Sequence, residues 1–251
     1  MSGFSVAAAR AGLPDTGLIT VTEMLDQGRQ LCDAVSIPVI GDGDTGHGNA
    51  ANVQRTMHQF KQAGFAGIML EDQVSPKRCG HTGVKEVVAR DVAIQRISAA
   101  VEARRQGADL VIVARTDARS AFAQSYGERG ALDEALWRLK AFAELGADVL
   151  FLEAPRSEEE MLRFCNEVPG KRMANMLEGG VTPLLLPDHL GDMGFHLVAY
   201  PLTLLASAAF AMRQAVTDLQ FGKTPERMLS FSELKALVNF DAYDDAVSKR
   251  I

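Results

Sequence analysis

Residues 38–46 read PVIGDGDTG, and residues 68–73 read IMLEDQ. Each stretch begins with a short apolar run typical of a strand and ends in acidic residues, among them Asp42, Asp44 and Glu71. The α/β barrels carry their chemistry at the carboxyl ends of parallel strands. Carboxylates that meet there repel one another unless a cation or water lies between them. The two stretches therefore predict an α/β fold in which acidic strand ends surround a cation.

Apolar, strand-like runs recur along the rest of the chain, and helical patterns separate most of them. The runs are Phe4–Ala8, Ile37–Gly41, Ala66–Leu70, Leu110–Ala114, Val149–Leu152, Met173–Met176 and Phe195–Tyr200. Gly64, Gly107 and Gly146 each follow a helical pattern and precede a strand, as helix-terminating glycines do. Strands that alternate with helices indicate a parallel sheet. No linker or low-complexity stretch divides the chain, so a single domain over residues 1–251 is predicted.

Two architectures fit this pattern. One is an open α/β sheet of seven strands, and the other is a (β/α)8 TIM-type barrel that lacks its first strand and helix. Polar or charged residues end successive runs: Asp42 and Asp44, Glu71, Arg115, Glu153 and Asn175. Such ends converge on one mouth in a barrel but spread along a line in an open sheet. The barrel is favoured. Residues 220–251 are expected to form a C-terminal helical segment that closes the barrel or reaches a neighbouring subunit.

Composition excludes several classes of protein. The chain has 251 residues and a net charge of −6, and no basic, aromatic-rich stretch suggests a nucleic acid partner. Three widely spaced cysteines are typical of a reducing compartment, so a cytoplasmic protein without a signal peptide is expected. Residues 195–212 are apolar and close to membrane-spanning length, but His196 and Pro201 interrupt them. A strand followed by a packed helix is the better interpretation, with no membrane partner.

The residues at the strand ends suggest specific chemistry. Asp42 and Asp44 are spaced to face one side of a strand and share a divalent cation, although a solvated Asp-Gly turn has the same composition. Glu71 is expected to hold a metal-bound water, unless it is simply exposed. Arg115 can bind a carboxylate through two hydrogen bonds, or it can form a salt bridge with Asp117 or another strand-end acid. Glu153 and Asn175 either orient substrate or form structural hydrogen bonds.

The loop from Lys77 to His81 reads KRCGH. Its cationic and imidazole groups would lower the pKa of the Cys79 thiol and favour the thiolate. A thiol can act as a proton donor as well as a nucleophile. Cys79, Lys77 and His81 are therefore candidate catalytic residues, although an exposed loop with an incidental cysteine is the plainer alternative.

Taken together, these motifs resemble the isocitrate lyase and phosphoenolpyruvate mutase superfamily. The matching pieces are SGFS at residues 2–5, GLPD at 12–15, DGDTG at 42–46, LEDQ at 70–73, KRCGH at 77–81, ARTD at 114–117, EAP at 153–155 and ANM at 174–176. Members have a strand and helix before the Ser-Gly-Phe segment, which here starts at residue 2. The resemblance implies a (β/α)8 barrel, Mg²⁺ or Mn²⁺, and a homo-oligomer, a dimer of dimers whose subunits swap C-terminal helices.

The resemblance also implies roles for individual residues. Asp42, Asp44 and Glu71 would hold the metal and its waters, with support from Asp15. Four residues would cradle an α-keto acid or its enolate: Ser2, Gly3, Phe4 and Arg115. The loop that contains Cys79 would gate the site.

Cys79 separates the branches of the family, because the phosphonate-forming mutases carry Asn at its position. A Mg²⁺-dependent carbon–carbon lyase is thus expected, which cleaves a 2-hydroxy di- or tricarboxylate resembling dimethylmalate or methylisocitrate to an α-keto acid and a carboxylate through an enolate. Residues 175–180 look more like the dimethylmalate lyase and oxaloacetate hydrolase branch. The alternatives are an oxaloacetate hydrolase, a phosphoenolpyruvate or carboxyphosphonoenolpyruvate mutase, and an inactive relic that only binds metabolites.

Overall fold

The computed structural model describes residues 1–79 and 85–249. The chain divides into two compact units, Met1–Thr203 and Leu204–Ile251. The expectation of one domain over the whole chain stays a prediction. Among the described residues, no helix is both long enough and apolar enough to cross a membrane.

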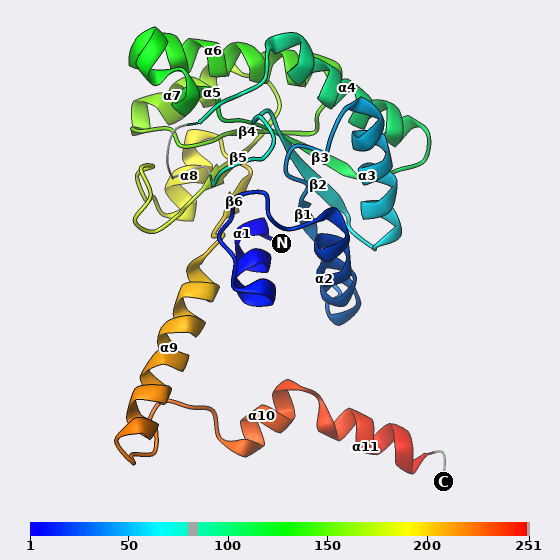
Figure 1. Ribbon diagram of the computed structural model, residues 1–251, viewed down its shortest axis with the longest axis vertical. Helices are drawn as coiled ribbons and strands as arrows, with labels where there is room; N and C mark the ends of the chain where they lie inside the picture. The colour runs from blue at the N-terminus through cyan, green and yellow to red at the C-terminus, as the bar shows by residue number, and fades with distance from the viewer. Residues whose placement is uncertain (80–84, 250–251) are drawn as a thin grey trace. The chain divides into compact units, whose positions relative to one another are not determined.

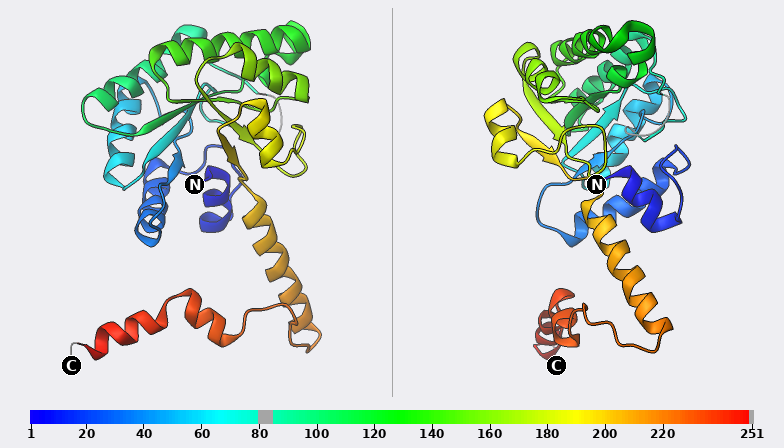
Figure 2. Two further views of the ribbon diagram at one scale, coloured as in Figure 1. Left: turned by 180° about the vertical axis from the view of Figure 1, so that it is seen from behind. Right: turned by 90° about the vertical axis from the view of Figure 1, so that its left-hand side faces the viewer.

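The first unit is built around a parallel sheet with the strand order β1-β2-β3-β4-β5-β6. The strands are β1 (Ile40–Asp42), β2 (Gly67–Glu71), β3 (Val111–Thr116), β4 (Val149–Leu152), β5 (Lys171–Asn175) and β6 (Leu197–Ala199). The sheet curls, and most of the helices lie around its outer side (Figure 1, Figure 2). This is an α/β fold with the form of a partial TIM barrel, so the barrel-like interpretation is confirmed over the open sheet.

Helices follow most strands, as the sequence pattern predicts. In the first unit they are α1 (Gly3–Val6), the π-helix η1 (Ala7–Ala11), α2 (Val21–Ala34), α3 (Ala50–Gln62), α4 (Arg90–Arg105), α5 (Ala118–Ala121), α6 (Ala123–Leu145), α7 (Glu158–Glu167) and α8 (Pro187–Met193). Gly64, Gly107 and Gly146 have φ values of 93°, 105° and 102°. These left-handed conformations favour glycine, and they end α3, α4 and α6 where predicted.

One predicted strand is wrong. Residues 4–8 are helical, in α1 and η1, because the Ser2 side chain accepts a hydrogen bond from the Ser5 N–H and caps a helix there. A short apolar run does not by itself distinguish a strand from a buried helix. The helix joins the two edges of the sheet. The Met1 amino group donates to the Ile40 carbonyl of β1, and Ser5 Oγ donates to the Pro201 carbonyl beyond β6 at 2.9 Å.

Two apolar layers lie on opposite sides of the sheet. The larger one packs the outer face of the strands, including Ile112 and Ala114, against the helices. The smaller one lies on the inner face and contains Val113, Val149 and Phe151. Successive strand residues alternate between these faces. The inner-face positions that follow these apolar residues are the ones that carry the polar strand ends.

Close packing of α2 against Phe65 gives a test of the outer layer. A Cβ atom on Gly28 would lie 2.1 Å from the Phe65 ring. We expect Gly28→Ala to lower the free energy of unfolding, because overpacking costs about 1–3 kcal/mol and outweighs the helix propensity gained, about 1 kcal/mol. Urea denaturation measures this change. Gly191→Ala in α8 is the matched control, since its Cβ would meet no atom within 4 Å. Gly191→Ala should stabilise, and equal effects of the two variants would contradict the packing.

The second unit contains three helices, α9 (Thr203–Gln220, whose first residue belongs to the first unit), α10 (Phe231–Leu237) and α11 (Phe240–Ser248). The side chains of Ser230 and Glu233 form a capping box at the start of α10. Many large apolar side chains of this unit are exposed, among them Phe210, Leu219, Phe231 and Tyr243. α10 and α11 lie within residues 220–251, and the role predicted for that segment, to close the barrel or reach a neighbouring subunit, stays a prediction.

Candidate active site

Strand alternation brings the polar strand ends together on the inner face of the sheet. Met69 lies on that face, and Glu71 follows two residues later in β2. Val113 and Arg115 repeat the relation in β3. Glu71 and Arg115 are register partners, and the Arg115 Nε lies 3.3 Å from Glu71 Oε2. The carboxyl ends of β2 and β3 thus place a carboxylate and a guanidinium group side by side.

Arg115 is the centre of one group of charges. Its Nε and Nη2 donate to the two oxygens of Asp117, each at 2.9 Å. Its Nη2 also lies 3.4 Å from Glu153 Oε1, and Asn175 Nδ2 donates to Glu153 Oε2 at 3.5 Å. Burial lowers the pKa of Arg115, but the carboxylates of Asp117, Glu153 and Glu71 raise it well above its ordinary value. Arg115 is therefore a permanent cation in a nearly dry site.

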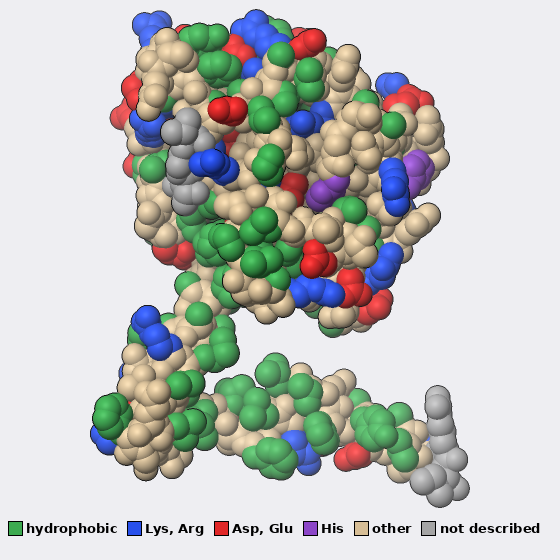
Figure 3. All heavy atoms as spheres, viewed as in Figure 1, with side chains coloured by type: hydrophobic (Ala, Val, Ile, Leu, Met, Phe, Trp, Pro, Cys, Tyr) green, Lys and Arg blue, Asp and Glu red, His purple; other side chains and the backbone are tan. Residues whose placement is uncertain are grey.

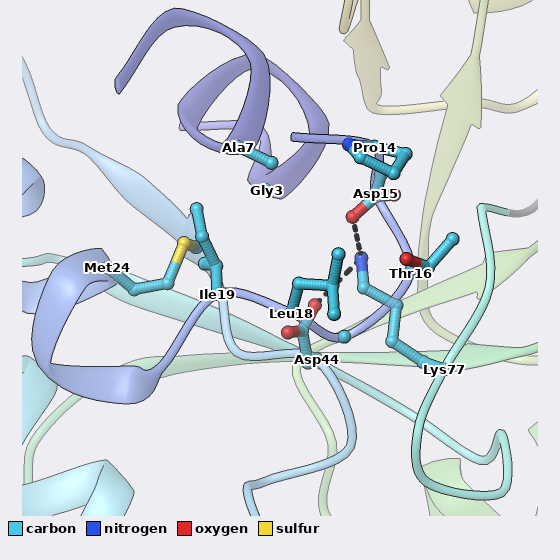
Figure 4. A pocket seen from close by; sticks show the side chains of 11 residues that line it. Gly3, Ala7, Pro14, Asp15, Thr16, Leu18, Ile19, Met24, Asp44 and Lys77 are labelled. Atoms are coloured by element: carbon cyan, nitrogen blue, oxygen red, sulfur yellow. Dashed lines mark ion pairs between the residues drawn. The ribbon is translucent and has the colours of Figure 1, made fainter. Parts of the chain in front are cut away.

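Lys77 is the centre of a second group. Its ammonium lies 2.5 Å from Asp15 Oδ1 and 2.9 Å from Asp44 Oδ1, and Figure 4 shows it between the two carboxylates. Burial lowers the pKa of Lys77, yet Asp42, Asp44 and neighbouring acids raise it above its ordinary value. The segment that begins the KRCGH loop is thus anchored over the acidic strand ends by ion pairs.

Asp44 reaches this site by a turn rather than by strand alternation, which corrects the predicted geometry. β1 ends at Asp42, and Asp44 adopts a φ of 47°. The Asp44 N–H donates to Asp42 Oδ1 at 3.1 Å, a local bond that suits Asp in a left-handed conformation. Gly3 N–H donates to Asp42 Oδ2 at 3.1 Å, and a Cβ on Gly3 would lie only 2.7 Å from that oxygen. Glycine is therefore required beside Asp42.

The acids of the site are unequally stabilised. Burial raises the pKa of Asp42, but Lys77, Arg115 and two N–H donors lower it overall. Burial and the Asp42 charge raise the pKa of Asp44 to about 7, against the opposing effect of Lys77. Burial also raises the pKa of Glu71 well above its ordinary value, although Arg115 opposes this. Burial is the largest cause of both upward shifts, so a cation placed against Asp44 and Glu71 would favour their charged forms.

The donor set fits a hard divalent cation. Within the described residues, Glu71 Oε1 and His47 Nε2 are buried and have no hydrogen-bond partner. The same residues contain no cluster of three or more His, Cys, Asp or Glu arranged to hold a metal. Mg²⁺ does not need such a cluster, because it usually takes one or two carboxylates and keeps several waters. Asp42, Asp44 and Glu71 would fit such a site if water lay between the ion and some of these carboxylates.

The other predicted residues are placed as follows. Ser2 caps α1, and Phe4 lies in that helix, half-buried. Cys79 is half-buried at the end of the described part of the loop, whereas His81 lies outside the described residues. The catalytic, substrate-binding and metal-binding roles assigned from the sequence stay predictions.

Sequence reasoning overlooked three buried residues near the site. Gln73 hydrogen-bonds Asp117, and Asp72 accepts hydrogen bonds from Thr116 and Arg138. Lys85 is 4% exposed, and burial lowers its pKa against the opposing charges of Asp117 and Cys79. The spacing of Glu71 and Gln73, two residues apart at a strand end, was the available signal for Gln73. For Asp72 and Lys85 the sequence shows no comparable pattern.

Comparison with known proteins assigns the family. Residues 1–220 match the family model described as phosphoenolpyruvate phosphomutase. The chain is 42% identical over 245 residues to 2,3-dimethylmalate lyase of Eubacterium barkeri, covering 96% of this chain and 82% of that protein. It is 41% identical over 248 residues to the chloroplastic carboxyvinyl-carboxyphosphonate phosphorylmutase of Arabidopsis thaliana, covering 97% and 71%.

Solved structures agree with this assignment. An oxaloacetate acetylhydrolase bound to 3,3-difluorooxalacetate has a TM-score of 0.90 at 32% identity, covering 100% of this chain and 84% of that one. A phosphonopyruvate hydrolase bound to oxalate and Mg²⁺ has a TM-score of 0.81 at 29% identity, covering 99% and 84%. Both matches cover all or nearly all of this chain, including the curled sheet. The chain therefore belongs to the phosphoenolpyruvate phosphomutase family and is an enzyme of the PEP mutase/isocitrate lyase superfamily.

Proposed function

We propose that this enzyme is a Mg²⁺-dependent carbon–carbon lyase that acts on a small carboxylate substrate. The substrate is a 2-hydroxy di- or tricarboxylate of the dimethylmalate or methylisocitrate type, cleaved to an α-keto acid and a carboxylate through an enolate. One observation carries the proposal. Arg115 and the acids Asp42, Asp44 and Glu71 meet at one end of the sheet, beneath a segment that ends in Cys79. The 42% identity to a named lyase supports it.

The metal would be held by Asp42, Asp44 and Glu71, directly or through water, with Asp15 as a supporting acid. When bound, the ion supplies Lewis-acid stabilisation of negative charge on substrate oxygens, as Mg²⁺ or Mn²⁺ can. The high pKa of Asp44 and the unpartnered oxygen of Glu71 support this assignment. The Mg²⁺ in the related phosphonopyruvate hydrolase supports the choice of cation.

The chain's own residues then account for the cleavage. Arg115 binds a substrate carboxylate and stays charged, because acids on three sides hold its pKa high. A carboxylate of the site acts as the base and takes the proton of the substrate hydroxyl. The hydroxyl oxygen then forms the new carbonyl, and the electrons of the broken C–C bond pass to the enolate fragment. Cys79 gives a proton to the enolate carbon. The backbone of Ser2, Gly3 and Phe4 and the side chains of Glu153 and Asn175 orient the substrate, and Lys77 and His81 act with Cys79.

A product assay tests the proposal. The enzyme is incubated with Mg²⁺ and, separately, dimethylmalate, methylisocitrate, oxaloacetate and phosphonopyruvate, and the products are identified by NMR. An α-keto acid from one of the hydroxy acids is the expected result. Oxalate and acetate from oxaloacetate would instead support a hydrolase, the second candidate, which the TM-score of 0.90 to oxaloacetate acetylhydrolase favours. Conversion of phosphonopyruvate to phosphoenolpyruvate would support a mutase, and no turnover of any substrate would contradict the lyase.

Metal binding is tested separately. We expect Asp44→Asn to weaken Mg²⁺-dependent oxalate binding by at least ~10-fold, because even residues that only support metal ligands contribute 10–100-fold to affinity. Isothermal titration of the enzyme with oxalate, with and without Mg²⁺, measures the change. Asp192→Asn, at an exposed position in α8, is the matched control. Unchanged binding by Asp44→Asn would remove Asp44 from the metal site.

The oligomer is part of the proposal. The curled sheet is the larger part of a (β/α)8 barrel, and α9–α11 pack on a second copy as swapped helices in a cytoplasmic dimer of dimers. Large apolar side chains exposed along these helices support this (Figure 3), among them Phe210, Leu219, Phe231 and Tyr243. Apolar patches of this kind usually mark interaction surfaces. Light scattering on the eluting protein measures the mass, and a monomer would contradict the proposal.

A further inference from the structure

The side chain of Gln73 connects the loop segment at Arg78 with the group of charges around Arg115, which lie far apart in the sequence. That side chain is 2% exposed and lies just beyond β2. Gln73 Oε1 accepts a hydrogen bond from the Arg78 N–H at 2.9 Å, and its Nε2 donates to the Arg78 carbonyl at 2.8 Å. Nε2 also donates to Asp117 Oδ1 at 3.1 Å. One amide group therefore holds the backbone beside Cys79 and the carboxylate beside Arg115 at the same time.

The Asp117 end of this connection leads directly to the proposed substrate-binding cation. Asp117 Oδ1 accepts hydrogen bonds from both Gln73 Nε2 and Arg115 Nη2, and Oδ2 accepts from Arg115 Nε. Asp117 is fully buried, so these bonds form in a medium of low dielectric constant, where they are strong. A shift of Arg115 toward a bound carboxylate would therefore change the hydrogen bonds that Gln73 makes.

The base of the KRCGH loop is held together by hydrogen bonds that do not involve the side chain of Gln73. Val74 N–H donates to the Glu86 carbonyl, and Val88 N–H donates to the Asp72 carbonyl, both at 2.9 Å. Arg138 Nη1 donates to Asp72 Oδ2 at 3.1 Å and to the Val88 carbonyl at 2.9 Å. These bonds fix residues 72–74 against residues 86–88. The Gln73 amide extends that hold to Arg78, so its loss should displace the segment 77–79 without separating the base of the loop.

We propose that Gln73 is a positioning residue that makes the placement of Lys77–Cys79 depend on carboxylate binding at Arg115. The inference rests on the proposed function for the identity of the ligand. It assigns Gln73 no contact with substrate. A chain of hydrogen bonds runs from the guanidinium of Arg115 through Asp117 and Gln73 to the backbone of Arg78. Misplacement of a reacting group by about 1 Å can cost ~10²-fold in rate, which sets the expected effect.

The test uses variants of Gln73 and the reactivity of Cys79. Cys32→Ser and Cys165→Ala are introduced first, so that iodoacetamide reports only on Cys79. Gln73→Leu keeps the size of the side chain and removes its hydrogen bonds. Gln73→Glu keeps the acceptor for the Arg78 N–H but places a carboxylate against Asp117. Gln106→Leu is the matched control, because Gln106 Nε2 makes only a surface bond to Glu102 within α4 and the turn after it.

Mg²⁺ and oxalate are expected to slow alkylation of Cys79 in the parent and in Gln106→Leu. In Gln73→Leu this protection should be lost, while the oxalate Kd from isothermal titration changes by less than about threefold. In the turnover assay kcat should fall ~10²-fold with little change in KM. Cys79 should be alkylated faster in Gln73→Glu than in Gln73→Leu, even without oxalate. The carboxylate introduced at position 73 repels that of Asp117 and so displaces the segment beside Cys79.

The outcomes separate this inference from the proposed function. Full protection of Cys79 in Gln73→Leu would overturn the inference, whatever substrate the enzyme turns over. A lower Tm of Gln73→Leu with an unchanged kcat would also overturn it, because that result indicates a structural role alone. Failure of oxalate to protect Cys79 in the parent would also overturn it. Oxalate binding and protection without turnover of any substrate would uphold the role of Gln73 and overturn only the lyase.

Discussion

Replacement of Cys79 by serine is expected to lower kcat by ~100-fold or more while Mg²⁺-dependent oxalate binding stays unchanged. An acid–base group contributes about 10²–10⁴-fold to turnover, and a serine hydroxyl is too weak an acid to replace a thiol in that role. Cys79 is half-buried and shares its surroundings with the buried Lys85 amine, whose charge it influences. The substitution removes the proposed proton donor but leaves Asp42, Asp44 and Arg115 in place, so binding and turnover should separate.

Steady-state kinetics on the best substrate of the panel measure the effect of Cys79→Ser. Cys32→Ser is the matched control, because it makes the same chemical change at a half-buried position in α2. The control should keep the parent kcat. Near-parent turnover by Cys79→Ser would remove the thiol from the mechanism and leave the enolate to be protonated by another group.

Arg115→Lys is expected to lower kcat/KM by ~10²–10³-fold, the usual cost of losing a preorganised donor to developing negative charge. Lysine keeps the charge but has a single nitrogen. That nitrogen cannot replace all the contacts of the guanidinium group at once. These are the contacts with both oxygens of Asp117, with Glu71 and Glu153, and with the proposed substrate carboxylate. Lysine is chosen over alanine because removal of the cation would leave buried carboxylates unpaired, at a cost of about 3–5 kcal/mol in stability.

Kinetics and oxalate titration are compared for Arg115→Lys and for Arg163→Lys. Arg163 in α7 forms exposed ion pairs with Asp133 and Glu167, so its replacement by lysine makes the same change where it should not matter. The two variants should have similar Tm values. Retention of both oxalate affinity and kcat by Arg115→Lys would show that Arg115 only balances the charge of Asp117.

The convergence of Glu71 and Arg115 was predictable because strand geometry is local. Glu71 and Arg115 end apolar runs, and the alternation of strand residues places both on the inner face with Met69 and Val113. The same reasoning was incomplete for Asp44. That residue reaches the site through a turn with positive φ, stabilised by the Asp42 carboxylate, which strand periodicity does not describe.

In the N-terminal segment, by contrast, the sequence pattern gave the wrong secondary structure. Residues 4–8 are apolar and were predicted as a strand, but their helix is decided by the Ser2 cap and by contacts with β1 and the segment after β6. The role of Gln73 also escaped prediction, because its hydrogen bond to Asp117 joins residues remote in sequence. The pairing of Arg115 with Asp117, two residues away, was one of the two interpretations that the sequence allowed.

The amino-acid sequence alone determined the alternation of strands and helices, the glycines that end α3, α4 and α6, and the acids at the ends of β1 and β2. These features depend on side-chain period and on φ, which neighbours along the chain impose. Only the tertiary structure placed Lys77 between Asp15 and Asp44, raised the pKa of Asp44 to about 7, and joined Arg115 to the loop through Gln73. Burial and ion pairing cause these effects, and both depend on residues that folding brings together from distant segments.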